Sequence, residues 1–221
     1  MKLFFTWFLY FIIYSFIGWV VEVTFCFFTE KKLINRGFLI GPVCPIYGCG
    51  VLLIVLLIGN NTSDILSVFL KSILICSILE YSTSYLMEKI FDARWWDYSK
   101  KRFNINGRIC LETMIPFGIL GSGVILYLHP FISKLVGSLS NSLLIIIGAI
   151  TMVLFLTDYI ISFNVLSKIK NEIKNHKTDS TEIIRKKVIK WLYNNSFLFK
   201  HIADAFPKFT IRKKKEKVLE K

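Results

Sequence analysis

The sequence is short of acidic residues and histidine, and it lacks the motifs that identify most soluble enzymes. It has 15 Asp and Glu against 28 Lys and Arg, and only three His. It contains no G-x-x-x-x-G-K-[ST] phosphate loop, which excludes ATP hydrolysis at such a loop in this chain. The five Cys show no C-x-x-C spacing, so neither a zinc site nor a disulfide framework is indicated. We therefore predict no metal and no cofactor.

Long apolar runs are what the sequence has in abundance. Hydrophobic residues make up 54% of the 221 residues, and the mean hydropathy is +0.55. A helix needs about 20 predominantly apolar residues to cross a bilayer. The first run is too long for a removable signal peptide, so we expect it to be an anchor. The sequence predicts an all-α integral membrane protein with five transmembrane helices, at 3–28, 39–59, 65–90, 109–129 and 139–167.

The distribution of Lys and Arg predicts how these helices are oriented. Basic residues are concentrated in the loops 29–38 and 91–108 and in the tail 168–221. The connection 60–64 has none, and the connection 130–138 has only Lys134. Cytoplasmic loops carry the excess of positive charge. The prediction is therefore an N-terminus outside and a C-terminus inside.

Four of the acidic side chains in the predicted spans are candidates for function, because an acid in lipid is costly and usually faces a cavity or a partner. All four lie in the half of their span nearest the predicted cytoplasmic side. One interpretation is a single polar pocket that opens to the cytoplasm. The other is a set of separate structural ion pairs, Glu22 with Arg36 and Glu112 with Arg108. The four acids are Glu22, Glu80, Glu112 and Asp158.

The stretch "NRGFLIGPVCPIYG", residues 35–48, places helix breakers where the second span should begin. Pro is tolerated in a first helical turn, and irregular backbone is tolerated at membrane depth where it lines a cavity or is buried in protein. A helix N-terminus also attracts anions, and Arg36 adds charge. We therefore predict that this stretch is a wall of the pocket. The stretch "NINGRICLETMIPFG", residues 104–118, has a similar order of Asn, Arg and Pro, which suggests two parallel hairpin repeats.

The loop 91–108 and the tail are the remaining polar regions. Trp95, Trp96 and Tyr98 are predicted to be interfacial anchors, whereas Asp97 is expected to reach Arg36 or Arg108 or to contact a head group or a partner.

The tail 168–221, which we separate from the membrane domain 1–167, has sixteen basic and six acidic residues. Its stretch "DSTEIIRKKVIKWLY" predicts an amphipathic helix with Asp179 as N-cap. We expect the apolar face of this helix on an anionic inner leaflet. On this view the fold tolerates loss of the tail. No nucleic-acid-binding motif is present, and nucleic acid is not a predicted partner. The apolar face consists of Ile184, Val188, Trp191 and Leu192.

Five strings, "FIGWVVE" (16–22), "NRGFLIGPVCPIYG" (35–48), "EY" (80–81), "WDYS" (96–99) and "NINGRICLE" (104–112), together resemble the bacterial ABC-transporter type IV, or CmpB-like, family of membrane proteins. The resemblance covers about residues 7–165, and it implies a multi-pass, permease-like protein of the bacterial cytoplasmic membrane. It further implies a separate ATPase subunit that docks on the loop 91–108, and a five-span permease is small enough that a homodimer is expected. The motif residues are Gly18, Trp19, Glu22, Asn35, Arg36, Gly37, Gly41, Pro42, Tyr47, Gly48, Glu80, Trp96, Asp97, Tyr98, Asn106, Gly107 and Arg108.

Two functions remain open at this point. In a permease subunit the buried acids and arginines would line a path for a substrate or an ion. The alternative is a membrane-embedded enzyme or a lipid-head-group-binding protein that acts on an anionic substrate at the inner leaflet, with Glu22 and Glu80 as acid and base. No nucleophile identifies an enzyme, so no catalytic residue is assigned. We expect Glu22, Glu80, Arg36 and Arg108 to meet in one cavity. The candidate binding residues are Glu22, Asn35, Arg36, Tyr47, Glu80, Asp97, Asn106, Arg108 and Glu112.

Overall fold

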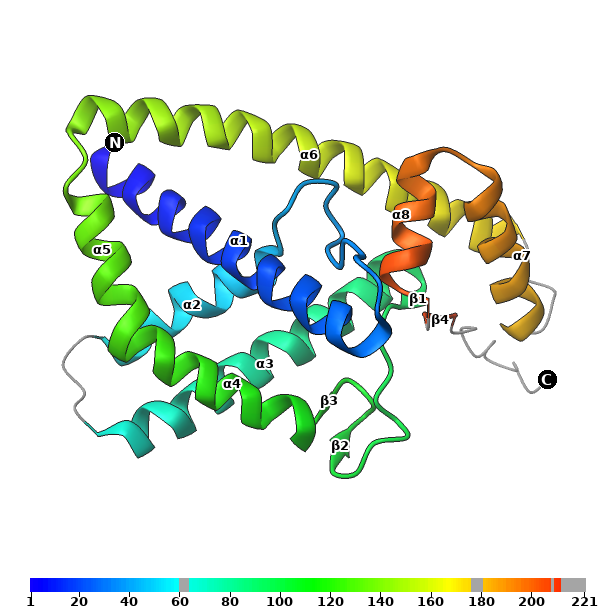
Figure 1. Ribbon diagram of the computed structural model, residues 1–221. Coiled ribbons are helices and arrows are strands. Elements are labelled where there is room, and N and C mark those ends of the chain that lie inside the picture. The colour runs from blue at the N-terminus through cyan, green and yellow to red at the C-terminus, as the bar shows by residue number, and fades with distance from the viewer. Residues whose placement is uncertain (60–63, 176–180, 208, 212–221) are drawn as a thin grey trace, which may run out of the picture.

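The computed structural model describes residues 1–59, 64–175, 181–207 and 209–211, and its regular secondary structure is helical apart from two short strand pairs (Figure 1). Strand β1 (Ala93–Arg94) pairs antiparallel with β4 (Thr210–Ile211), and β2 (Asn104–Ile105) pairs antiparallel with β3 (Ile109–Cys110). The helices are α1 (Lys2–Glu30), α2 (Pro45–Ile58), α3 (Ile65–Phe91), α4 (Leu111–Gly123), the π-helical turn η1 (Val124–Leu128), α5 (His129–Gly137), α6 (Asn141–Asn175), α7 (Thr181–Asn194) and α8 (Phe197–Ala205).

Four helical segments of the described chain are long and apolar enough to cross a membrane. The predicted second span, 39–59, is not among them. Its helix α2 has 14 residues and measures about 21 Å, which is shorter than the roughly 30 Å of a bilayer core. The preceding residues 31–44 are irregular. Pro45 is the first residue of α2, a position where the missing N–H does no harm. The four segments are Lys2–Glu30, Ile65–Phe91, Leu111–Gly137 and Asn141–Asn175.

Glycines allow neighbouring helices to approach closely. A Cβ atom on Gly18 of α1 would overlap the side chain of Tyr47 at the start of α2. A Cβ atom on Gly121 of α4 would overlap Ser72 of α3. Close approach at small residues is the usual way in which membrane helices pack, because lipid is as apolar as the helix surface.

Helix α3 has an apolar outer face and a polar inner face. Leu74 and Ile78 are exposed, with 61% and 58% of their surface accessible. This arrangement is expected of a helix that has lipid outside and polar contacts inside. The buried positions include four polar residues, Ser72, Ser77, Glu80 and Ser84.

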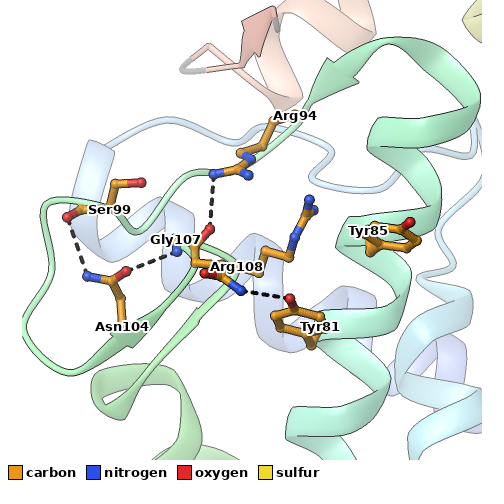
Figure 2. A pocket seen from close by; sticks show the side chains of 8 residues that line it. Tyr81, Tyr85, Arg94, Ser99, Asn104, Gly107 and Arg108 are labelled. Carbon is orange, nitrogen blue, oxygen red and sulfur yellow. Dashed lines mark hydrogen bonds between the residues drawn. The ribbon is translucent and has the colours of Figure 1, made fainter. Parts of the chain in front are cut away.

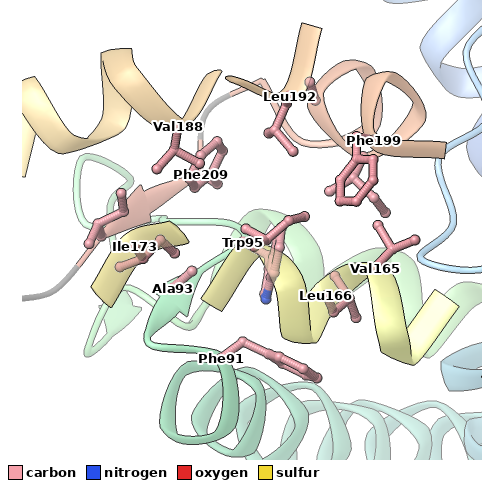
Figure 3. Close-up of a cluster of buried hydrophobic side chains, with 14 of the residues drawn as sticks. Phe91, Ala93, Trp95, Val165, Leu166, Ile173, Val188, Leu192, Phe199 and Phe209 are labelled. Carbon is pink, nitrogen blue, oxygen red and sulfur yellow. The ribbon is translucent and has the colours of Figure 1, made fainter. Parts of the chain in front are cut away.

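The tail packs onto the protein, which corrects the expectation of an apolar face on the membrane. Helix α7 forms within the predicted stretch, but Val188 and Leu192 on its apolar face are buried against Trp95 and its neighbours (Figure 3). Trp191 contacts the ring of Phe199, with a centroid distance of 4.9 Å. The side chain of Trp95 is 3% exposed, so it is a core residue rather than an interfacial anchor. Asp179 lies outside the described residues.

Candidate functional site

Two buried arginines from the segment between α3 and α4 share one glutamate of α3. Arg94 Nε lies 2.8 Å from Glu88 Oε2, and Arg108 Nη2 lies 3.0 Å from the same oxygen. Arg108 Nη1 also donates to Ser84 Oγ at 3.1 Å. The arginines are 3% and 5% exposed. Buried charges are tolerated when they are paired and hydrogen-bonded, so Glu88 fixes both guanidinium groups in position.

A tight turn places Arg108 at this glutamate. Asn106 and Gly107 both have positive φ angles, 53° and 66°, and Arg108 N donates to Ile105 O at 3.0 Å. These features define a type I′ hairpin turn, which favours Asn-Gly. A Cβ atom at position 107 would overlap Ser99 and Asp97, so the turn requires glycine there.

A pocket of about 380 Å³ opens beside the turn (Figure 2). The Arg108 guanidinium carbon lies 5.7 Å and 5.3 Å from the ring centroids of Tyr81 and Tyr85, and Asn106 Nδ2 donates to Tyr81 Oη at 2.9 Å. Arg94 Nη2 is buried and has no hydrogen-bond partner among the described residues. The lining residues are Tyr81, Tyr85, Arg94, Ser99, Asn104, Asn106, Gly107 and Arg108.

Asp97 lies next to this pocket and is bound to Arg94. Its Oδ1 atom accepts hydrogen bonds from Arg94 Nη1 at 3.3 Å and from Ser99 N at 3.0 Å. Burial alone would raise the pKa of Asp97, but the hydrogen bonds from Ser99 and the charge of Arg94 outweigh it, and the pKa is lowered. The expected contacts with Arg36 or Arg108 are therefore replaced by contacts with Arg94 and Ser99.

Two of the predicted acids, Glu80 of α3 and Glu22 of α1, are bound to different partners in the bundle. Glu80 is 8% exposed and accepts from Tyr98 Oη at 3.4 Å and from Thr113 Oγ1 at 3.5 Å. Glu22 accepts from Tyr47 Oη at 2.5 Å. Burial raises the pKa of Tyr98, and Glu80, Cys110 and Glu22 raise it further. The two carboxyl groups are therefore hydrogen-bonded to different tyrosines, Glu80 to Tyr98 and Glu22 to Tyr47.

The irregular segment 31–44, predicted to be an anion-binding wall, is closed by a carboxylate of the protein itself. Asp158 of α6 accepts from Ile40 N at 2.9 Å and from Gly41 N at 2.8 Å. Asn35 Oδ1 accepts from the Trp19 indole at 2.7 Å, and its Nδ2 donates to Ile40 O at 2.9 Å. The N–H groups of Ile40 and Gly41 are therefore already bonded to an anion.

The remaining predicted residues lie elsewhere. Arg36 Nη1 donates to Ala205 O of α8 at 2.7 Å. Glu112 is exposed and pairs with Lys101 at 2.6 Å. The alternative pairs Glu22–Arg36 and Glu112–Arg108 are therefore wrong. Of the nine candidates, the pocket is lined by Asn106 and Arg108.

Sequence reasoning missed Glu88, Arg94 and Tyr85, which hold or line the pocket. A signal for them was available, because positions 81, 84, 85 and 88 have the i, i+3, i+4, i+7 spacing of one helix face. Tyr81, Ser84 and Tyr85 contact Arg108, and Glu88 forms an ion pair with it.

Comparison with protein families matches residues 9–163 to the family described as Putative ABC-transporter type IV. The matched range includes the pocket and both bundle carboxyl groups, and it ends before the tail. No curated protein and no solved structure matches the chain. Because the match covers more than half of the 221 residues, the chain belongs to the Putative ABC-transporter type IV family.

Proposed function

We propose that this membrane protein is a permease-like subunit of a transport system, with a polar interior that opens toward the cytoplasm. The observation that carries the proposal is the buried face of α3. Its polar residues extend from Ser72 to Ser84, a distance of about 18 Å along the helix. The hydroxyl groups of Ser72 and Ser77 have no partner among the described residues, and buried polar groups without a protein partner commonly bind water.

The proposed topology keeps five crossings, with the N-terminus outside and the C-terminus inside a bacterial cytoplasmic membrane. The segment 31–44, the segment 92–110 and the described part of the tail, with α7 and α8, lie at the same end of the bundle (Figure 1). These segments carry most of the positive charge, which favours the cytoplasmic side and its anionic lipids. In this topology, the irregular segment 31–44 and the short helix α2 together make the second crossing.

Two partners follow from the proposal. Family membership favours a separate ATPase subunit, since this chain lacks a phosphate loop of its own. The exposed Lys100 and Arg102 of the loop 91–108 are placed to contact such a subunit. A second copy of the chain would enlarge a small bundle into a complete transport path.

Cysteine accessibility tests the polar interior. In a chain whose five cysteines are replaced, Ser84→Cys and Ser77→Cys are treated with a membrane-impermeant thiol reagent from the cytoplasmic side. We expect them to react at least tenfold faster than the lipid-facing controls Leu74→Cys and Ile78→Cys. Equal rates would overturn the proposal.

The same assay tests the topology with two exposed loop positions, Ser99 and Ser138. Ser99→Cys should react only from the cytoplasmic side, whereas Ser138→Cys should react only from outside. Reaction of position 99 in intact cells would refute the orientation.

A lipid-head-group-binding protein is the second candidate, because the pocket between Arg94 and Arg108 faces the proposed inner leaflet side. Purification from native membranes in mild detergent, followed by mass spectrometry of proteins and lipids, separates the two. A stoichiometric ATPase supports the permease, and a bound phospholipid without an ATPase supports the second candidate.

A further inference from the structure

We propose that the pocket between Arg94 and Arg108 is a binding site for a phosphate group. The site deepens the proposed function, since it assumes that the pocket faces the cytoplasm, but it does not require transport. The shared ligand chemistry is a phosphate monoester or diester, whether it belongs to a soluble molecule or to a phospholipid head group.

The first argument is the unpaired nitrogen of Arg94. Its Nε atom is occupied by Glu88, and its Nη1 atom by Asp97 and the carbonyl of Asn106. Nη2 has no partner among the described residues, although the side chain is only 3% exposed. A buried donor without a partner costs about 1–3 kcal/mol, and more when it is charged. An oxygen acceptor in the pocket would satisfy it.

The second argument is the composition of the lining. Its eight residues include two arginines, two asparagines, two tyrosines and a serine, and none of the eight is acidic. Glu88 and Asp97 hold the guanidinium groups, but they are not part of the lining. An occupant therefore meets two positive charges and several hydrogen-bond donors. Phosphate oxygens fit this set, because arginine binds them through paired N–H groups in a planar fork.

The third argument is that the site is already formed. Arg108 is fixed by Glu88 and Ser84, and it lies beside the rings of Tyr81 and Tyr85 (Figure 2). Asn104 is also fixed, since it accepts from Gly107 N at 2.9 Å and donates to Lys101 O at 2.7 Å. Donors held in place lose little freedom on binding. The volume of about 380 Å³ lies within the range of small-molecule sites, so it accommodates a phosphate and a small attached group.

The test uses the full chain, purified in detergent, and two probes. The first is inorganic phosphate, with thermal unfolding and titration calorimetry as readouts. The second is a nanodisc that contains phosphatidic acid, compared with one that contains only phosphatidylcholine. Arg94→Lys keeps the positive charge beside Glu88 but removes Nη2, and we expect it to weaken binding at least tenfold. The matched control, Arg102→Lys, makes the same change at an exposed arginine of the same loop and should leave phosphate binding unchanged.

The outcomes separate the sources of the ligand. Saturable binding of inorganic phosphate that Arg94→Lys weakens supports a soluble ligand. Binding of phosphatidic acid alone, weakened in the same way, supports a lipid head group. Equal binding by both proteins, or no binding of either probe, overturns the proposal. If Arg94→Lys melts at a much lower temperature, the test is made on the protein without substitutions, by modifying its arginines with phenylglyoxal. Bound phosphate should slow the modification of Arg94 and Arg108 relative to that of Arg102. Equal slowing at all three would contradict the site.

These results can be distinguished from failure of the proposed function. If the serines of α3 react no faster than the lipid-facing controls, the polar interior is wrong, whereas phosphate binding at Arg94 can still be present. Conversely, a reactive serine face with no phosphate binding leaves the permease proposal intact and removes only this site.

Discussion

The two segments that lead into α2 and α4, residues 31–44 and 92–110, use similar residues for different ends. Each has an asparagine, a glycine and an arginine in close succession, and the two touch where Phe38 meets Trp95, with ring centroids 5.1 Å apart. The first is closed by Asp158 and by α8. The second leaves an open pocket. Composition alone therefore does not decide which segment can bind a ligand.

The two segments differ in the groups that their neighbouring carboxylate binds. Asp158 binds two backbone N–H groups of the first segment, and Arg36 is left to bind a carbonyl of the tail. In the second segment Glu88 binds both guanidinium groups from one side. Both arginines also line the pocket, and Nη2 of Arg94 has no hydrogen-bond partner among the described residues. A pocket therefore remains in the second segment, where the carboxylate of Glu88 binds arginine side chains, and not in the first, where the carboxylate of Asp158 binds backbone N–H groups.

The largest effect is expected from removing the tail that covers both segments. Truncation after Asn171 exposes Trp95 and Ala93, which share a buried cluster with residues of α7 and β4. Burial of each large apolar side chain contributes roughly 1.5–3 kcal/mol, so we expect accumulation in the membrane to fall severalfold. This reverses the expectation from sequence that the fold tolerates the loss.

A point variant sharpens this test. Val188→Asp places a charge at a position that is 0% exposed and should lower the melting temperature strongly, whereas Lys186→Asp on the exposed face of α7 should not. Normal accumulation and melting of the truncated chain would show that the tail is separate from the fold.

A smaller effect on stability should distinguish Arg108 of the second segment from Arg36 of the first. Arg108→Ala breaks a buried ion pair, which typically costs about 3–5 kcal/mol, although Glu88 keeps Arg94 as a partner. Arg36→Ala removes the bond to Ala205 and should cost about 1 kcal/mol. Chemical unfolding of the purified variants measures both. Glu88→Gln combined with Arg108→Ala should be less harmful than the sum of the two single changes, because it leaves no unpaired carboxylate. Equal effects of the two arginine changes would contradict the comparison.

The smallest effect concerns pH and the closed segment. His201 of α8 is buried and contacts the carbonyl of Leu39 at 3.1 Å. Burial lowers its pKa, and the backbone carbonyls of Leu39 and Gly37 offset this only in part. The unfolded chain therefore binds a proton at higher pH than the folded chain does. The stabilisation is complete above the unfolded pKa of about 6.5 and declines as the pH falls below it.

We expect the melting temperature of the unmodified protein to fall by a few degrees more than that of His201→Gln between pH 8 and pH 5.5. The control removes the titration but keeps a donor for Leu39. An identical pH dependence in the two proteins would show that His201 does not contribute.

The four long apolar segments could be predicted from sequence, because long apolar runs determine where helices form in lipid. Helix α8 was not predicted, and the expected connection 130–138 is largely the helix α5. The structure of the polar segments between and after these helices was predicted less accurately. The breakers at Gly41 and Pro42 indicated an irregular segment, but the carboxylate that fills it is Asp158, which is remote in sequence. The amphipathic pattern of Ile184 and Val188 predicted α7, yet the same pattern suits a membrane surface and a protein core equally. Only tertiary packing distinguishes these possibilities.

The candidate site was predicted only in part, because its remaining residues are brought together by tertiary packing. Arg108 and Asn106 were identified because the stretch 104–118 has the same order of Asn, Arg and Pro as 35–48 and carries motif residues of the family. Glu88 was overlooked because a glutamate near the end of a predicted helix resembles an ordinary surface residue. The Asn-Gly pair flanked by Ile105 and Ile109 is a hairpin signal that could have located the turn.

The pairing of β1 with β4 has a consequence for how the protein is made. Arg94 lies opposite Thr210 in this pair, so one strand of the pocket segment acquires its partner only after residue 211 has left the ribosome. All the membrane-spanning helices will have been synthesised by then. A ribosome that stalls within the tail would therefore leave a chain that is inserted in the membrane but whose pocket end is uncovered. Membrane quality-control proteases would be expected to recognise such a chain by its exposed aromatic residues.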